Sequence, residues 1–107
     1  MMIERNVFRI RFGRMKEAKA IWLEIIRTIN VDTQDRKDKE VKVRMLTDIT
    51  GPSYILVIES ELRDFIHIGF QKYQWLTNNR VSKLYQQFTE ICESSERTLY
   101  HIDYVKN

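Results

Sequence analysis

The sequence has few of the residues that form disulfides or metal sites. Its 107 residues include one cysteine, Cys92, and two histidines, His67 and His101. One cysteine excludes a disulfide within the chain, and its spacing from the histidines fits no zinc site. We therefore expect no metal and no cofactor. The lack of a disulfide framework favours a reducing, cytoplasmic setting.

Long apolar runs are also absent. No stretch approaches the roughly 18 apolar residues that a membrane helix requires. Charges interrupt the N-terminal "MMIERNVFRIRFGR", which argues against a secretory signal. The net charge of +3 is mild, and no helix-turn-helix, zinc-finger or aromatic RNA-binding pattern accompanies it. We expect neither a membrane nor a nucleic-acid partner.

Glycine and proline are scarce, at three and one, so a place where they adjoin is informative. Gly51-Pro52 separates an alternating segment, residues 41–47, from residues 54–58, which are apolar throughout. This pattern predicts a β-hairpin. With 43% apolar and 31% charged residues, the composition is that of one globular domain over residues 1–107.

The N-terminal half of the chain changes its periodicity once. Residues 7–12 alternate, which predicts a strand with Phe8, Ile10 and Phe12 on one face. After Gly13, apolar residues recur at helical spacing up to Ile29. The mixed-charge residues 32–40 then predict an exposed loop.

The C-terminal half is helical in two pieces and ends in a strand. Residues 62–76 are aromatic-rich, and residues 77–79 ("TNN") supply a cap for the second helical piece. That piece, residues 81–95, shows clean helical spacing, with Cys92 on the apolar face. Residues 98–105 alternate again, which predicts a last strand.

The resulting order is strand, helix, strand, strand, helix, strand. It predicts an α+β, ferredoxin-like βαββαβ fold: a four-stranded antiparallel sheet with both helices on one face and strands one and three in the centre. Helices then cover one face only, yet residues 54–58 are apolar on both. A second subunit is the simplest cover, giving a homodimer through the open sheet face. The alternative is that these residues are apolar because β-branched side chains favour strands, and that the outer face of the sheet is partly exposed to solvent.

Three segments carry a resemblance: "FRIRFGRMKEAKAIW", "TDITGPSYILVIESEL" and "LYQQFTEICESSERTLYHIDY". Together the sequence resembles the dimeric α/β-barrel superfamily, which includes NIPSNAP-like proteins, antibiotic-biosynthesis-type monooxygenases and haem-degrading monooxygenases. The resemblance is architectural, because no segment is a catalytic signature. It implies two sheets closed face to face, with a ligand inside the barrel or between sheet and helices.

Charged residues on the strands form the first candidate site. Arg9 and Arg11 lie opposite the Phe8 face, and we expect four side chains from other strands to join them on the dimer side: Arg44, Glu59, His101 and Asp103. Guanidinium groups grip carboxylates in pairs, so this cluster suits a small anionic or carbonyl-bearing ligand. Asp103 beside His101 would orient an imidazole for proton transfer. The alternative is cross-strand ion pairing that fixes sheet and dimer.

Aromatic residues form the second candidate site. Haem-degrading relatives use an Asn on the first strand, a Trp in the second helical region and a His about ten residues later. Asn6 and Trp75 fit that resemblance, but Tyr85 stands where the His would be, which argues against haem. Trp75 and Tyr85 are kept as ligand-lining candidates beside three further aromatics of residues 62–76: Phe65, Phe70 and Tyr73. His67 and Cys92 are interpreted as structural.

No residue set forms an identifiable catalytic constellation. We therefore expect an uncharacterised homodimeric α/β-barrel protein that binds a small organic ligand. The alternative is a cofactor-independent monooxygenase acting on a polycyclic or quinol-like compound, with Arg9, Arg11 and His101 stabilising the substrate anion.

Overall fold

The computed structural model describes residues 1–32, 42–51, 53–62 and 77–107. Its elements follow in the order β1 (Met2–Ile10), α1 (Met15–Asp32), β2 (Val43–Thr47), β3 (Ile55–Leu62), α3 (Asn79–Glu90) and β4 (Cys92–His101). This confirms the predicted order of strands and helices. The predicted loop at 32–40 (apart from Asp32, which ends α1) and the helical piece at 62–76 (apart from Leu62, which ends β3) lie outside the described residues.

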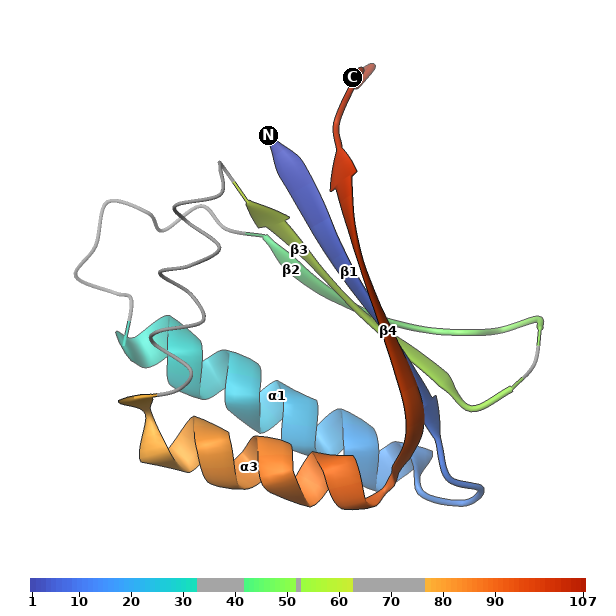
Figure 1. Ribbon diagram of the computed structural model, residues 1–107, viewed down its shortest axis with the longest axis vertical. Helices are drawn as coiled ribbons and strands as arrows, with labels where there is room; N and C mark the ends of the chain where they lie inside the picture. The colour runs from blue at the N-terminus through green and yellow to red at the C-terminus, as the bar shows by residue number, and fades with distance from the viewer. Residues whose placement is uncertain (33–41, 52, 63–76) are drawn as a thin grey trace.

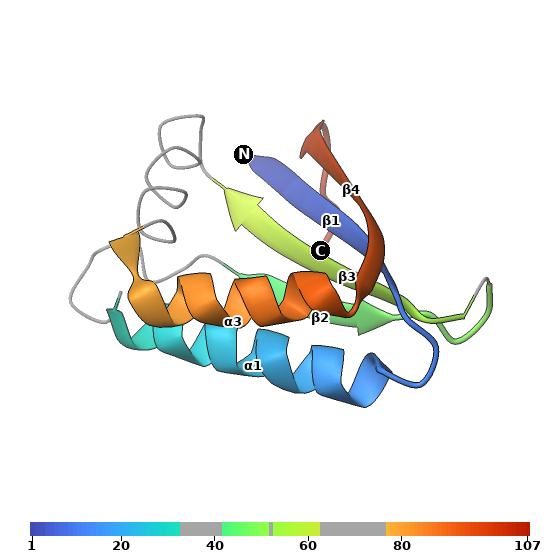
Figure 2. The same cartoon turned by 60° about the horizontal axis from the view of Figure 1, so that its bottom comes forward.

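The strands form one antiparallel sheet in the order β2-β3-β1-β4. β1 and β3 are central, as predicted. Figure 1 shows α1 and α3 side by side on the same side of the sheet, and Figure 2 shows the sheet slanting over both helices. An ion pair joins the helices, with 2.5 Å between Arg80 Nη2 and Glu24 Oε1. The chain therefore has the predicted α+β, ferredoxin-like arrangement.

Strand pairing decides which side chains share a face. Phe8 is paired with Leu56 on β3 and Ser95 on β4, whereas Arg5 is paired with Glu59 and Thr98. Paired residues point to the same side and their neighbours to the other. Even-numbered residues of β1 thus face the helices. The opposite side, which no described helix contacts, is called the open face, and its residues are Ile3, Arg5, Val7, Arg9, Arg44, Leu46, Ile55, Val57, Glu59, Glu61, Ser94, Glu96, Thr98 and Tyr100.

Three aromatic rings form the centre of the core between sheet and helices. Trp22 of α1 and Phe88 of α3 are 2% and 1% exposed. Their ring centroids are 5.5 Å apart, and the Phe8 ring lies 4.8 Å from that of Phe88, edge-on. Trp22 belongs to the segment up to Ile29 whose apolar residues recur at helical spacing, and that spacing puts it on the buried side of α1. The apolar stripes of both helices and the even residues of β1 therefore meet in one cluster.

β1 begins and ends earlier than predicted. It covers Met2–Ile10, and the chain turns directly afterwards: the Arg14 amide bonds to the Arg11 carbonyl, and Gly13 has a φ of 80°. Phe12 is therefore in a turn, 86% exposed, and not on the core face with Phe8. Alternation continued past Ile10 in the sequence, but the turn reverses the chain before Phe12 can pair.

α3 is shorter at its C-terminus than predicted. The Asn78 side chain caps its start by accepting from the Val81 amide at 3.0 Å, as residues 77–79 indicated. The helix ends at Glu90, however, and Cys92 begins β4 opposite Ile10. Pairing with β1 replaces helical hydrogen bonds here, so the helical spacing of residues 92–95 was misleading.

The predicted hairpin joins β2 to β3 and is held by one carboxylate. Asp48 accepts from the amides of Ser53 at 2.7 Å and Ile55 at 3.1 Å. Ser53 and Tyr54 both have positive φ, 67° and 60°, a region that costs a non-glycine residue free energy. The Asp48 bonds offset that cost. Among the described residues, no helix has the length and apolarity needed to cross a membrane.

Candidate functional site

An ion-paired row crosses the open face on neighbouring strands. Glu59 of β3 is 3% exposed although it is charged. Arg5 donates to Glu59 Oε2 from Nε at 3.0 Å and Nη2 at 2.8 Å, and Arg44 donates to Oε1. The Arg5 guanidinium also lies 5.2 Å from the centre of the Tyr100 ring. We call Arg44, Glu59 and Arg5 the charged row.

The strand register creates the charged row. Glu59 is paired with Arg44 on one side and Arg5 on the other, so a single carboxylate lies between two guanidinium groups. The hydrogen bond from Arg44 is the largest cause that lowers the pKa of Glu59; burial opposes it and Arg5 adds to it. The same hydrogen bond raises the pKa of Arg44. Glu59 is therefore ionised, and the row carries one net positive charge.

We expect the free energy of unfolding of Glu59→Gln to fall less steeply than that of the wild type as the pH is lowered. A carboxyl whose folded-state pKa lies below its ordinary 4.5 stabilises the fold fully above that pH, and the contribution is lost as pH falls through the folded value. Urea unfolding at pH values from neutral to below 4.5 would measure this. Glu90→Gln, which removes an exposed carboxylate on α3 away from the charged row, is the control. If the free energy of unfolding fell equally with pH in Glu59→Gln and in the wild type, the charged row would not stabilise the fold as argued.

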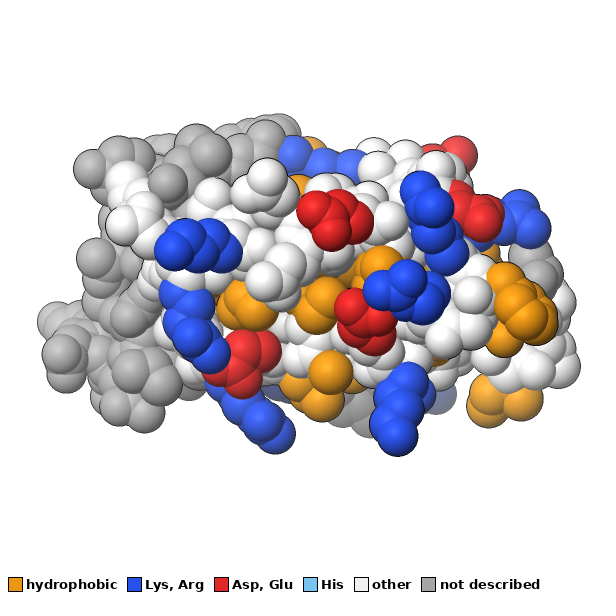
Figure 3. All heavy atoms as spheres, turned by 90° about the horizontal axis from the view of Figure 1, so that it is seen from below, with side chains coloured by type: hydrophobic (Ala, Val, Ile, Leu, Met, Phe, Trp, Pro, Cys, Tyr) orange, Lys and Arg blue, Asp and Glu red, His pale blue; other side chains and the backbone are white. Residues whose placement is uncertain are grey.

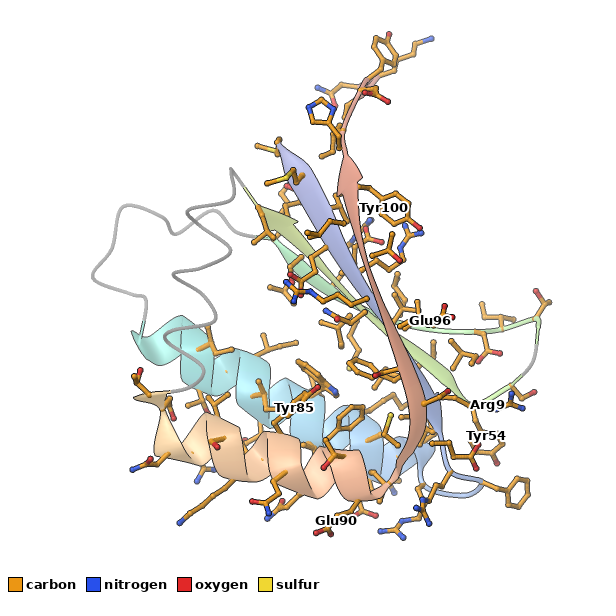
Figure 4. All side chains as sticks on the ribbon, viewed as in Figure 1. Arg9, Tyr54, Tyr85, Glu90, Glu96 and Tyr100 are labelled. Atoms are coloured by element: carbon orange, nitrogen blue, oxygen red, sulfur yellow. The ribbon has the colours of Figure 1, made fainter. Side chains whose placement is uncertain are left out.

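The predicted arginines are only partly brought together. Arg44 contacts Glu59. This contact agrees with the alternative interpretation, in which the arginines form cross-strand ion pairs. Arg9 lies at the other end of the open face, where its Nε is 3.6 Å from Glu93 Oε2. Figure 4 shows Arg9 near the end where β1 turns into α1. Arg11 follows β1 in an exposed turn and belongs neither to the charged row nor to the Arg9–Glu93 pair.

The predicted face of His101 is wrong. His101 is paired with Met2, a core-side residue, so it lies on the helix-facing side, and Tyr100 takes the place on the open face. A register shift between Arg9 and Ile10 accompanies the early start of β4. His101 Nδ1 lies 3.1 Å from Asp103 Oδ1, as predicted, but their side chains are 73% and 93% exposed. This pair is separate from the charged row.

Sequence reasoning missed Arg5 and Tyr100. Arg5 lay outside the predicted strand at 7–12, although it continues the alternation of Val7 and Arg9 backward. Tyr100 alternates with His101, so the prediction that His101 lies on the dimer side left Tyr100 on the other side. Trp75 and His67 lie outside the described residues. No group of three or more histidine, cysteine or acidic side chains in the described ranges is placed to hold a metal ion.

A second polar group lies on the helix-facing side of β1 and β4. Asn6 donates to Glu4 Oε1 at 2.9 Å, and Arg97 donates to Glu4 Oε2 at 2.8 Å. Neither Glu4 nor Asn6 is exposed. We call Glu4, Asn6 and Arg97 the inner polar group. Asn6, which by resemblance could have belonged to a haem site, uses its amide to hold Glu4.

Tyr85 of α3 contributes a phenol beside the aromatic core. Its ring centroid is 6.2 Å from that of Trp22 and 6.1 Å from that of Phe88. Figure 4 shows it on the side of α3 toward the sheet. Burial raises its pKa, so the hydroxyl stays protonated at neutral pH. A few polar groups beside an apolar aromatic surface are typical of small-molecule sites.

The sequence matches no protein-family model and no curated protein. Solved structures do match. A NIPSNAP domain protein from Burkholderia xenovorans aligns over 100% of both chains with a TM-score of 0.79 and 16% identity. The chain has the fold of the NIPSNAP proteins. A NIPSNAP family protein from Agrobacterium tumefaciens covers 96% of this chain and 94% of its own, with a TM-score of 0.77 and 16% identity.

A structure described as an antibiotic biosynthesis monooxygenase also shares this NIPSNAP-like fold. It covers 99% of this chain and 100% of its own, with a TM-score of 0.65 and 11% identity. The predicted resemblance to NIPSNAP-like and monooxygenase-like proteins is thus confirmed for the fold. Identities this low leave substrate and activity to be argued from the side chains.

Proposed function

We propose that this NIPSNAP-like protein is a homodimer, joined through the open face, that binds a small organic ligand. The observation that carries the proposal is the composition of the open face. It combines an apolar surface on the central strands with a carboxylate, Glu59, that is buried and ion-paired before any partner is added. Such a surface is typical of an interface.

The apolar part of the open face is continuous. Val7 and Val57 are paired at its centre, and Leu46 is paired with Val57 on the next strand. Ile55 extends this surface toward the hairpin, whereas Ile3 lies on the other side of the charged row. The outer side of α1 and α3 differs, because acidic and basic side chains are interspersed over it (Figure 3). A mixed-charge surface suits solvent, so the sheet is the better candidate for self-association.

The inner polar group supports the ligand part of the proposal. Glu4, Asn6 and Arg97 supply a carboxylate, an amide and a guanidinium on the side of the sheet that faces the apolar core, and Tyr85 of α3 adds a phenol beside Trp22 of that core. These groups recognise hydroxyl and carbonyl oxygens of an otherwise apolar molecule. No nucleophile or activated base accompanies them among the described residues, which favours binding over turnover.

Native mass spectrometry of the purified protein tests both parts at once. We expect a dimer at micromolar concentration, with any retained small molecule visible as added mass on it. Denaturing the same sample should release that mass and leave the bare chain. A monomer at this concentration would overturn the homodimer. A dimer from which no mass is released, and which no aromatic hydroxy or keto compound stabilises in a melting assay, would overturn ligand binding.

A cofactor-independent monooxygenase is the second candidate. The likeness to a structure described as an antibiotic biosynthesis monooxygenase supports it. Oxidation of a tricyclic hydroxyanthrone by O₂ gives the quinone and water, and needs mainly a group that stabilises the substrate anion. An oxygen electrode would detect the uptake. Unchanged rates in alanine variants of Arg9, Arg11 and His101 would remove those residues from the mechanism.

A further inference from the structure

We infer that the partner subunit completes the charged row: Glu96 of each subunit pairs with Arg44 of the other, so that β2 packs over the partner's β4. This inference rests on the proposed homodimer and adds its arrangement. It concerns which edges meet and which side chains join them, neither of which follows from dimerisation itself.

The two edges of the open face carry opposite charge. Arg44 lies on the β2 edge and is the outermost member of the charged row. Glu96 lies on the β4 edge, opposite Val7, and is exposed. Within the described part of the chain its side chain makes no hydrogen bond or ion pair. Figure 4 shows Glu96 on β4, in the strand stretch between Arg9 and Tyr100.

A second subunit over the open face would bury the net positive charge of the charged row, and burying that charge costs free energy. Arg5 and Arg44 share one carboxylate, and their side chains remain 42% and 63% exposed in a single subunit. A second sheet would remove water from the unsatisfied guanidinium donors, and a buried charge needs a charged partner. Among the described residues, Glu96 is a carboxylate on the β4 edge of this face whose side chain no guanidinium contacts.

Symmetry offers two ways to pack identical sheets face to face. A two-fold axis along the strands places β2 over the partner's β4, whereas an axis across the strands places β2 over the partner's β2. The second arrangement brings Arg44 near its own copy, and like charges at an interface are unfavourable. The first places Arg44 over the partner's Thr98, which is in the same cross-strand row, and so one row from the partner's Glu96 on the same face, once from each subunit.

Charge reversal tests the energetic part. Glu96→Lys should raise the dimer dissociation constant about tenfold or more, because it adds a cation beside the charged row. Glu90→Lys makes the same change on α3, away from the open face, and should leave the constant within about twofold. Analytical ultracentrifugation measures both, and circular dichroism verifies that each variant is folded.

Crosslinking tests the geometry, in a Cys92→Ser background. Leu46 is in the same cross-strand row as Glu96, so Leu46→Cys protein mixed with Glu96→Cys protein should give a covalent dimer with a short bismaleimide. Neither protein alone should do so efficiently.

Efficient crosslinking of Leu46→Cys alone, or equal dissociation constants for Glu96→Lys and Glu90→Lys, would overturn this arrangement while leaving the dimer intact. A wild-type monomer would instead overturn the proposed function on which it rests.

Discussion

Phe88→Ala is expected to destabilise the protein by about 3–5 kcal/mol, the largest loss for a single side chain here. Phe88 is 1% exposed and holds three rings together: Phe8 of β1, Trp22 of α1 and Tyr85 of its own helix. Its removal leaves a cavity where sheet and both helices meet, and neighbours on three rigid elements cannot close it. Urea unfolding followed by tryptophan fluorescence would measure the change.

The neighbouring exposed residue gives the matched control. Gln87→Ala shortens a side chain on the same turn of α3 and should change stability by less than about 0.5 kcal/mol. Phe88→Leu, which keeps most of the volume, should fall between the two. A loss of stability under about 1 kcal/mol for Phe88→Ala would mean that the packed rings of Phe8, Trp22 and Phe88 do not hold the helices on the sheet.

Val57→Asp is expected to raise the dimer dissociation constant by about 100-fold or more, giving a folded monomer at micromolar concentration. Val57 is at the centre of the open face, between Leu46 and Val7, so a carboxylate there would be buried without a partner. Within one subunit the position is only partly buried, so the fold should tolerate the change. Ultracentrifugation and circular dichroism would separate dissociation from unfolding.

Val43→Asp makes the same substitution on the adjacent strand. Val43 is 37% exposed and is paired with Ser60 on the helix-facing side, so the dimer should survive. Dissociation by both variants would indicate general destabilisation, and dissociation by neither would exclude the open face as the interface.

The two variants also separate the two layers of the molecule. Phe88 acts between sheet and helices, and Val57 acts on the far side of the sheet. Loss of ligand with retention of the dimer in Tyr85→Phe would place the ligand on the helix side of the sheet, beside the aromatic core. This separation matters because the resemblance allowed a ligand on either side.

Local pattern was reliable for the fold wherever periodicity and turn chemistry agreed. The switch from alternation to helical spacing after Gly13 and the hairpin signal at Gly51-Pro52 led to the observed order of elements, with β1 and β3 central. The same patterns predicted the apolar stripe of α1 and a cap at residues 77–79. These features depend on neighbours within a few residues, which a sequence displays directly.

The candidate sites depended on pairing between distant strands, and there the sequence was not sufficient. That Arg44 meets Glu59 could be anticipated, because a hairpin joins β2 and β3. That Arg5 completes the row, that Tyr100 and not His101 faces it, and that β4 begins at Cys92 were decided by the register of β4 against β1. A shift of one residue moves every side chain of a strand to the other face. The sequence by itself determined the elements and their order; only the tertiary structure decided which charges share a face, because register is set by the packing of the whole sheet.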